Sequence, residues 1–284
     1  MLRIRHQLPA AIPTLLVLAA CATSGAQQPA SSPVPAEGKA RQFMDDCSHR
    51  WGGDDREHFC DVRDVTVPAT RSLDIDGDRN GSVTVHGWDR NDVRVVSMID
   101  ASAEDRSEAE RLGREVRVQT SGGRIHADTP DELRRRESVS VSYEVWLPRA
   151  TDLDLEAENG GISVDNVSSN VRLETTNGGV HLRDVGGDIH GGTTNGGVTV
   201  ELSGDHWNGE GLDLRTTNGG VRLALPANYS ARLTTGTVNG GMNVDFPITV
   251  QGRISREITA DIGRGGAPIR VVTTNGGVTI RKEP

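Results

Sequence analysis

The chain of 284 residues has few aromatic side chains, fewer basic than acidic residues and few long apolar runs, and each shortage argues against one class of partner or structure. Aromatic residues make up 3% of the sequence, which is too few for an extended platform on which sugar rings could stack. Its 31 Lys and Arg against 40 Asp and Glu give a formal net charge of −9, which argues against nucleic acid as a partner. After residue 20, no stretch is long and apolar enough to span a bilayer.

The first 20 residues are predicted to be an export signal, because Arg3 and Arg5 precede an apolar run that reaches Leu18. The segment closes on Leu18-Ala19-Ala20-Cys21, which resembles the bacterial lipobox at all four positions. The resemblance implies that Cys21 becomes the first mature residue and carries a diacylglyceryl thioether and an N-acyl chain. Several acyl chains form a stable membrane anchor. The alternative is an ordinary secretory signal in which this cysteine occurs by chance.

The residues after Cys21 indicate where the protein is anchored and how far the domain stands from the membrane. Ala22 rather than Asp follows the cysteine, which resembles the outer-membrane sorting pattern of Gram-negative lipoproteins. Residues 21–40 are rich in Pro, Ser, Ala and Gln and have no apolar period, so we expect a disordered tether. The sequence leaves open whether the domain faces the periplasm or the cell exterior.

Residues 41–70 contain the other two cysteines and are expected to cap the repeats that follow. The segments Cys47-Ser48-His49 and His58-Phe59-Cys60 hold the side-chain types that could bind zinc. A single cysteine pair in an exported protein more often closes a disulfide, so we predict a bond between Cys47 and Cys60. Zinc binding and two free thiols are the alternatives. We predict no metal site and no cofactor.

Residues 71–284 are expected to form one β-repeat domain, because Asn-Gly-Gly recurs six times in this range. The repeated asparagines are Asn159, Asn177, Asn195, Asn218, Asn239 and Asn275. The first three are 18 residues apart, and the later spacings are 23, 21 and 36 residues. A period near 18, once lengthened by an insertion and once doubled, predicts stacked repeats.

Apolar residues alternate with polar ones on both sides of each Asn-Gly-Gly, which predicts two strands per repeat. We expect the Asn-Gly-Gly to form a corner, since glycine tolerates positive φ. Inward columns of Thr and Asn are expected to bond to their equivalents in neighbouring repeats. We predict a β-solenoid of about 18-residue coils stacked in parallel, because a meander would leave one apolar face uncovered. Stacked antiparallel hairpins are the alternative.

Three further segments interrupt or extend the repeats. One short helix is predicted, with Ser102 as its cap, Asp105 three residues later and Gly113 at its end. The inserted segment 203–211 carries His206 and Trp207, which makes it the candidate contact loop, unless Trp207 folds back over a coil. The segment 263–266 is expected to be a corner that has lost its Asn.

The chain resembles a bacterial adhesin-like family of β-strand repeats, a domain of unknown function akin to adhesin-head and toast-rack repeats. The resemblance rests on the lipobox, the Thr-x-Asn-Gly-Gly-Val series and the segments Cys60–Asp64, Gly87-Trp88-Asp89 and Leu225–Ala231. It covers about residues 60–282. It implies a β-solenoid in the cell envelope and transfers no catalytic residues.

The outward positions of the repeats point to binding rather than to catalysis. Signs of charge alternate along these columns, as in Asp154, Arg172, His190 and Asp213, and no column is expected to concentrate acids. We therefore expect an outer-membrane-anchored lipoprotein that acts as a non-catalytic adhesin-like or structural module. Its partners would be the membrane, through the anchor, and an envelope protein or glycan. The alternative is a carbohydrate-active β-helix enzyme that acts on an envelope or extracellular polysaccharide.

Overall fold

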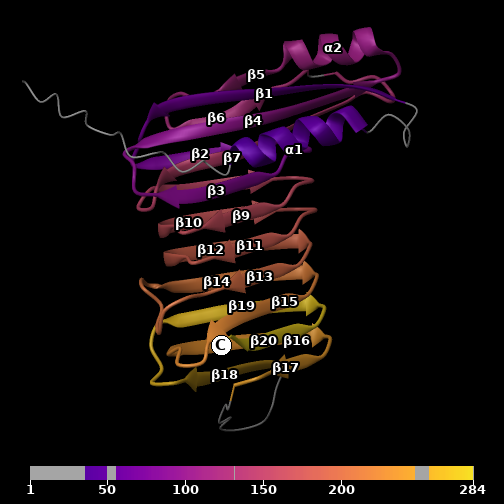
Figure 1. Ribbon diagram of the computed structural model, residues 1–284. Helices are drawn as coiled ribbons and strands as arrows, with labels where there is room; N and C mark the ends of the chain where they lie inside the picture. The colour runs from indigo at the N-terminus through magenta and orange to yellow at the C-terminus, as the bar shows by residue number, and fades with distance from the viewer. Residues whose placement is uncertain (1–35, 50–55, 131, 247–255, 284) are drawn as a thin grey trace, which may run out of the picture. The chain divides into compact units, whose positions relative to one another are not determined.

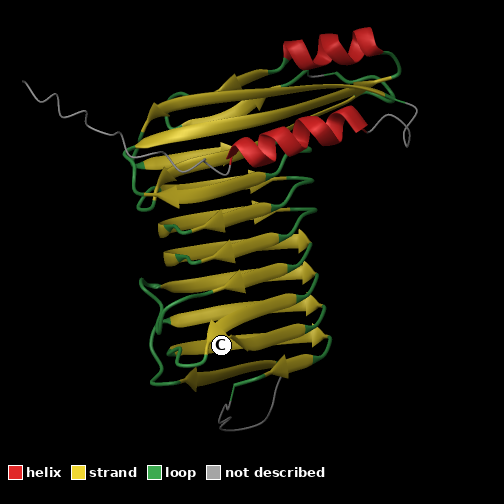
Figure 2. Ribbon diagram, in the orientation of Figure 1, coloured by secondary structure: helices red, strands yellow, loops and turns green. Residues whose placement is uncertain are grey.

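The computed structural model describes residues 36–49, 56–130, 132–246 and 256–283, which all belong to one compact unit from Pro35 to Pro284. The predicted export signal, Cys21 and most of the predicted tether lie outside these residues. Apart from two short helices the described residues form strands and turns, which confirms the all-β class (Figure 2).

Two ten-stranded sheets are formed by the described residues, and each repeat gives one strand to each sheet (Figure 1). Sheet A has the order β1 (Glu57–Pro68), β4 (Asp92–Ala103), β7 (Ser138–Pro148), β3 (Val83–Trp88), β9 (Ile162–Asp165), β11 (Val180–Arg183), β13 (Val198–Glu201), β15 (Val221–Pro226), β20 (Val278–Glu283), β17 (Met242–Val244). Sheet B has the order β18 (Glu257–Ile262), β16 (Ala231–Asn239), β19 (Pro268–Asn275), β14 (Gly211–Asn218), β12 (Gly186–Asn195), β10 (Ser168–Thr175), β8 (Asp152–Ala157), β2 (Ser72–Asp76), β6 (Arg124–Asp128), β5 (Arg117–Gln119).

Neighbouring repeats pair in parallel, so equivalent residues lie opposite each other. Leu173 of β10 pairs with Leu155 of β8, and Leu182 of β11 pairs with Val164 of β9. The hairpin alternative requires β8 to pair with β9, but β8 pairs with β10 and β2 instead. That alternative is therefore wrong for the repeats. Antiparallel pairs in the described residues occur only among the end strands, as in β1 with β4 and β16 with β18.

The aliphatic residues of each repeat fill a core between the two sheets. In the repeat of β10 and β11, the core residues Val171, Leu173, Val180 and Leu182 are 0–2% exposed. Burial of four such side chains contributes about 6–12 kcal/mol, before the cost of ordering the chain is subtracted. One repeat therefore depends on its neighbours for stability.

The order of repeats in space differs from their order in the sequence. The last repeat, β19 with β20, lies between β14/β15 and β16/β17, because β19 pairs in parallel with both β14 and β16. The chain reaches this position after β18, which pairs antiparallel with β16. The expected extra corner at residues 263–266 is therefore wrong. These residues instead turn the chain from the end strand β18 back into the stack, with φ of 58° at Gly263 and 73° at Gly265.

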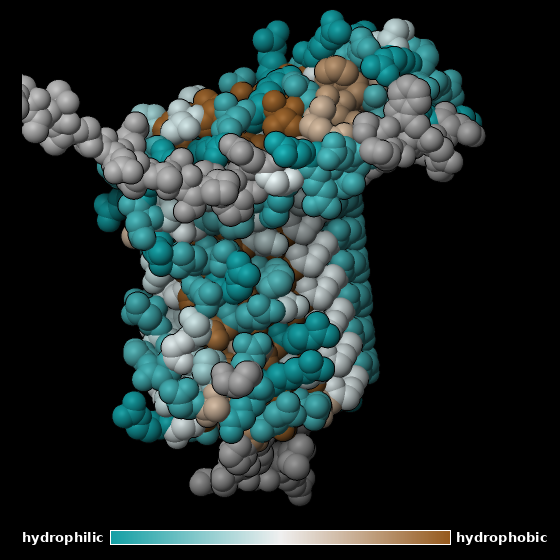
Figure 3. Space-filling model, in the orientation of Figure 1, coloured by the Kyte–Doolittle hydropathy of each residue, from teal (hydrophilic) through white to brown (hydrophobic). Residues whose placement is uncertain are grey.

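The corner asparagines form a ladder, but they face solvent rather than the core. Each amide Nδ2 donates to the Oδ1 of the next asparagine, as from Asn177 to Asn159 at 2.7 Å and from Asn195 to Asn177 at 2.8 Å. The expected inward position is wrong for the asparagines, which are exposed, and right for Thr175, which is buried. The Thr175 Oγ1 donates to the Gly160 carbonyl at 2.7 Å. A hydrophilic column runs along the corner edge of the stack in Figure 3.

The first glycine of each corner is required for close packing rather than for positive φ. Of these six glycines, only Gly276 has φ in the range that L side chains avoid. A Cβ at Gly196 would lie 2.0 Å from the Gly178 carbonyl oxygen of the neighbouring repeat. The next glycine, Gly197, has more room, since its nearest atom would be 3.4 Å away. The prediction that these glycines are needed for positive φ is therefore wrong, although the corners occur where the sequence predicts them.

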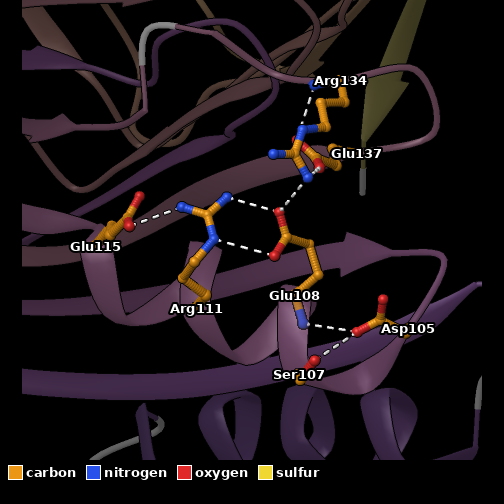
Figure 4. Close-up of polar contacts among 7 residues, drawn as sticks. All are labelled: Asp105, Ser107, Glu108, Arg111, Glu115, Arg134 and Glu137. Atoms are coloured by element: carbon orange, nitrogen blue, oxygen red, sulfur yellow. Dashed lines mark hydrogen bonds and ion pairs between the residues drawn. The ribbon is translucent and has the colours of Figure 1, made fainter.

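Helix α2 (Arg106–Glu115) occurs near the predicted position with a different cap. Asp105 is the N-cap and accepts a hydrogen bond from the Glu108 amide at 3.0 Å, whereas Ser102 belongs to β4. Gly113 lies inside the helix, where a Cβ would meet the ring of Phe59 at 2.1 Å. Figure 4 shows the exposed ion pairs that stabilise this helix, with Arg111 held between Glu108 and Glu115.

A second helix, α1 (Ala36–His49), was not predicted. It begins inside the segment expected to be a disordered tether, so that expectation is wrong for residues 36–40. The helix packs against β1 and β4 at one end of sheet A. The disulfide between Cys47 and Cys60 joins α1 to β1, which confirms the predicted bond.

Candidate functional site

The outer face of sheet B carries a hollow of about 710 Å³. Strands β8, β10, β12 and β14 form its base, and their outward positions supply most of its walls. The charged and histidine side chains that line it are Asp76, Asp78, Glu156, Glu158, Arg172, Glu174, His190, Asp213 and Arg215. We refer to this surface as the sheet B groove.

Two glycines of β12 leave the space at the base of the groove. Gly191 and Gly192 pair with Leu173 and Glu174 of the neighbouring strand β10. A Cβ at Gly191 would lie 1.8 Å from the carbonyl oxygen of Leu173, and one at Gly192 would lie 1.9 Å from that of Arg215. The backbone therefore approaches its neighbours too closely for any side chain, and the hollow results from this packing.

Ion pairs fix the charged side chains at one end of the groove. Arg172 lies 2.6 Å from Glu174 within β10, and Arg215 lies 2.9 Å from Asp213 within β14. Arg270 of β19 also reaches Asp213, at 3.1 Å. Partial burial opposes ionisation of Asp213, but the hydrogen bonds from both arginines hold its pKa below the usual value. Three arginines therefore lie against carboxylates at this end of the groove.

Acidic side chains gather at the other end of the groove. Because β2 stacks in register on β8, Asp74 lies beside Asp154 and Asp76 lies beside Glu156. Partial burial, together with the charges of Asp154 and Asp76, raises the pKa of Glu156. The expectation that no outward column concentrates acids is therefore wrong here. It was read from the Asn-Gly-Gly repeats alone, and the strand that supplies Asp74 and Asp76 precedes them.

A second hollow of about 580 Å³ adjoins the groove on the same face. Both hollows are lined by Arg172 and His190. The His190 side chain is 60% exposed, and its Nε2 lies 2.8 Å from Asp188. His181 lies in β11 of the other sheet, so the two histidines do not form a pair. Both hollows therefore lie on the outer face of sheet B.

The predicted contact loop is confirmed as a surface feature for only one of its two residues. Trp207 is 4% exposed, and its Nε1 donates to the Gly187 carbonyl at 3.0 Å, so it is part of the core. The stated alternative for Trp207, in which it folds back over a coil, is therefore correct, and Trp207 is not available as a contact residue. His206 remains outside with a 67% exposed side chain, 2.6 Å from Asp205.

The described part of the chain contains neither a cluster of metal-binding side chains nor a membrane-spanning helix. No group of three or more His, Cys, Asp or Glu side chains in these residues is arranged to hold a metal ion. No helix in the same residues is long and apolar enough to cross a membrane. On the face seen in Figure 3, hydrophilic side chains predominate and hydrophobic ones show only in small areas.

A family profile described as Toastrack DUF4097 matches residues 65–281. The chain belongs to this family. The match extends over both sheets, including β1 and β20 in part, and it confirms the resemblance seen in the repeats. Membership identifies the fold unit without assigning chemistry to the groove.

Solved structures resemble this Toastrack DUF4097 protein only distantly. A candidate cell adhesion protein from Clostridium sporogenes is 11% identical with a TM-score of 0.44, and the match covers 80% of this chain and 100% of that one. A candidate adhesin from Bacteroides fragilis is 10% identical with a TM-score of 0.40, covering 78% and 97%. No curated protein matches the sequence. At these identities and TM-scores, no role is transferred from the solved structures.

Proposed function

We propose that this Toastrack DUF4097 protein is an outer-membrane-anchored envelope lipoprotein that acts as a non-catalytic, adhesin-like binding module. In this proposal the parallel repeats are the coils of a β-solenoid, which serves as a rigid support. The sheet B groove is the contact surface, and the partner is a polar envelope protein or glycan. Residues 21–35 link the support to lipidated Cys21.

The paired charges in the groove are the observation that carries the proposal. Arg172 pairs with Glu174 within β10 and Arg215 pairs with Asp213 within β14, and only β12 lies between these two strands of sheet B. Charges of both signs presented on one face can orient a polar partner of complementary charge. A carboxylate held ionised by two arginines, as Asp213 is, is poorly suited to donating a proton.

The second candidate function is enzymatic, and Glu156 is the residue that supports it. Its raised pKa in a groove is a property of catalytic acids, and Glu174 lies in the next strand as a second carboxylate. A polysaccharide-cleaving enzyme would use such a pair as acid and base or nucleophile. If purified protein releases sugars from an envelope glycan and Glu156→Gln abolishes the release, the enzyme replaces the binding module.

Removal of the groove arginines is expected to weaken capture of the partner. The double variant Arg172→Ala/Arg215→Ala should lower partner recovery from crosslinked cell envelopes about tenfold or more, because two oriented charges are lost. The matched control is Arg222→Ala, which removes one arginine from the outer face of sheet A and should leave recovery unchanged. Equal losses in both variants would show that the groove is not the contact surface.

Mature protein from cells is expected to begin at Cys21 and to carry acyl groups there, as the lipobox predicts. Intact-protein mass spectrometry should find the added acyl mass, and Cys21→Ser should move the protein from the membrane fraction to the soluble fraction, since the anchor is then lost. An unmodified mature N-terminus would contradict the anchored form of the proposal and leave the groove prediction standing.

A further inference from the structure

Helix α1 covers a carboxylate on the outer face of sheet A. Glu144 of β7 alternates with Tyr143 and Val145, whose side chains belong to the core, so Glu144 faces outward. It is nevertheless only 1% exposed, and Val96, its partner in β4, is 2% exposed. The Lys39 Nζ of α1 lies 3.2 Å from the Glu144 Oε1. The Lys39 side chain therefore contributes to the cover of Glu144, and α1 packs against β4, the strand of Val96, at this end of sheet A.

Glu144 is only partly satisfied under this cover. Its Oε1 lies 3.0 Å from the His86 Nε2 of β3, while its Oε2 has no hydrogen-bond partner among the described residues. Burial alone would raise the pKa of Glu144, but the His86 hydrogen bond and the Lys39 ion pair hold it below the usual value. An ionised carboxylate with an unpaired oxygen gains hydration when it is exposed to water. The hydration that Glu144 would gain on exposure therefore opposes its burial beneath α1.

The described side chains of α1 are mostly exposed. Of the side chains from Gly38 to Cys47, only that of Cys47 is buried, while Ala40 and Phe43 are half-buried. The Lys39 side chain is 53% exposed, although its partner Glu144 is buried. A 14-residue helix is marginal in water without tertiary support. The Cys47–Cys60 disulfide keeps α1 next to β1, so that the helix can rebind to sheet A each time it detaches.

We propose that α1 is a thiol-controlled strap, which the Cys47–Cys60 disulfide keeps closed over Glu144 and which opens when this bond is reduced. A dithiol reductant supplies two electrons and two protons, the sulfur–sulfur bond breaks to give two cysteine thiols, and the reductant closes to its own disulfide. Release of α1 takes Lys39 from Glu144 and presents a carboxylate, with His86 beside it, on the surface of sheet A. The oxidation state of Cys47 and Cys60 thus determines whether Glu144 is exposed on the outer face of sheet A.

Carboxyl footprinting of the full chain tests the strap. Oxidised and dithiothreitol-reduced protein are treated with a carbodiimide and glycine ethyl ester, and modification of Glu144 is measured by mass spectrometry. We expect reduction to increase modification of Glu144 about tenfold or more, because the disulfide restrains the strap. Amide exchange in α1 should accelerate by a similar factor. Glu174, whose side chain is 60% exposed, is the internal control and should be modified equally in both states.

Two further measurements keep the outcome clear. The variant Cys47→Ser/Cys60→Ser should behave like the reduced protein without any reductant. Amides of β10 to β13 should keep their protection in every state, because the strap does not contact them. The proposal is wrong if alkylation shows free thiols while Glu144 and α1 stay protected. It is equally wrong if β10 to β13 lose protection together with α1, since the bond would then support the whole fold.

Discussion

The variant Gly196→Ala is expected to lose about 3 kcal/mol or more of unfolding free energy. The added Cβ would lie 2.0 Å from the Gly178 carbonyl oxygen, and the obstructing atom is backbone that cannot rotate away. Adjacent repeats would have to separate at the corner, which would also strain the Asn195–Asn177 hydrogen bond. Thermal and denaturant unfolding of the two proteins measures the difference.

The neighbouring substitution Gly197→Ala is the matched control for this prediction. Its Cβ would be 3.4 Å from the nearest atom, so we expect a loss below about 1 kcal/mol. Equal losses in the two variants would show that glycine is needed throughout the corner for its flexibility. No loss in Gly196→Ala would show that the repeats are not stacked this closely.

A chain that stops after Gly266 is expected to lose order in the middle of the stack rather than at its end. The deletion removes β19 and β20, whose Ile269, Val271, Val278 and Ile280 are 0–1% exposed. Their burial contributes about 6–12 kcal/mol, which is comparable to the whole stability of a typical domain. We expect amide exchange to accelerate in β14, β15, β16 and β17, because each loses a partner strand. If β14 and β15 keep full protection, the deleted repeat is not their neighbour.

Engineered cysteine pairs check the same arrangement in the full chain. Arg215 of β14 and Val272 of β19 are register partners, so cysteines at these positions should form a disulfide. Asp213 of β14 and Thr234 of β16 both pair with Arg270 of β19, from opposite sides, so they lie two strands apart. Cysteines at Asp213 and Thr234 should therefore remain unbridged. The opposite result would restore a stack that follows sequence order.

Local pattern was sufficient to predict the repeat and its parallel stacking. Alternation around Asn177 gave both strands of that repeat, and every core position of β10 and β11 is buried as expected. The asparagine ladder also followed from the sequence, because identical residues at a fixed period meet when repeats stack. The inward or outward position of the asparagine was not determined by alternation, since a corner interrupts the period of two.

The spatial order of the repeats could not be predicted from the local sequence pattern. The segments around Asn218, Asn239 and Asn275 have the same alternation, so each fits beside any other. Similarly, β6 and β7 stack on the far side of β2 and β3 rather than before β8. The acidic end of the groove depends on that stacking, and so it was missed. Gly191 and Gly192 were visible as exceptions in their columns and were the available signal for the groove.

Helix α1 was missed for a different physical reason. Its apolar residues Ala40, Phe43, Met44 and Cys47 have helical spacing and were the available signal, but the pattern covers only about two turns, and the bond from Cys47 to Cys60 helps to hold the helix in position. The disulfide was predictable from the cysteine count, but the element that it holds was not. A composition rich in Ala and polar residues fits both a disordered tether and a helix that a covalent link keeps in place.

Site-specific photocrosslinking in intact cells tests the proposed contact surface most directly. A photoreactive residue replaces His190 in the sheet B groove or, as the matched control, His181 on the outer face of sheet A. Their side chains are 60% and 51% exposed, so the two probes are comparably accessible. We predict a crosslinked envelope partner from position 190 and none from position 181. Crosslinks of equal yield from both positions, or from position 181 alone, would contradict binding through the groove.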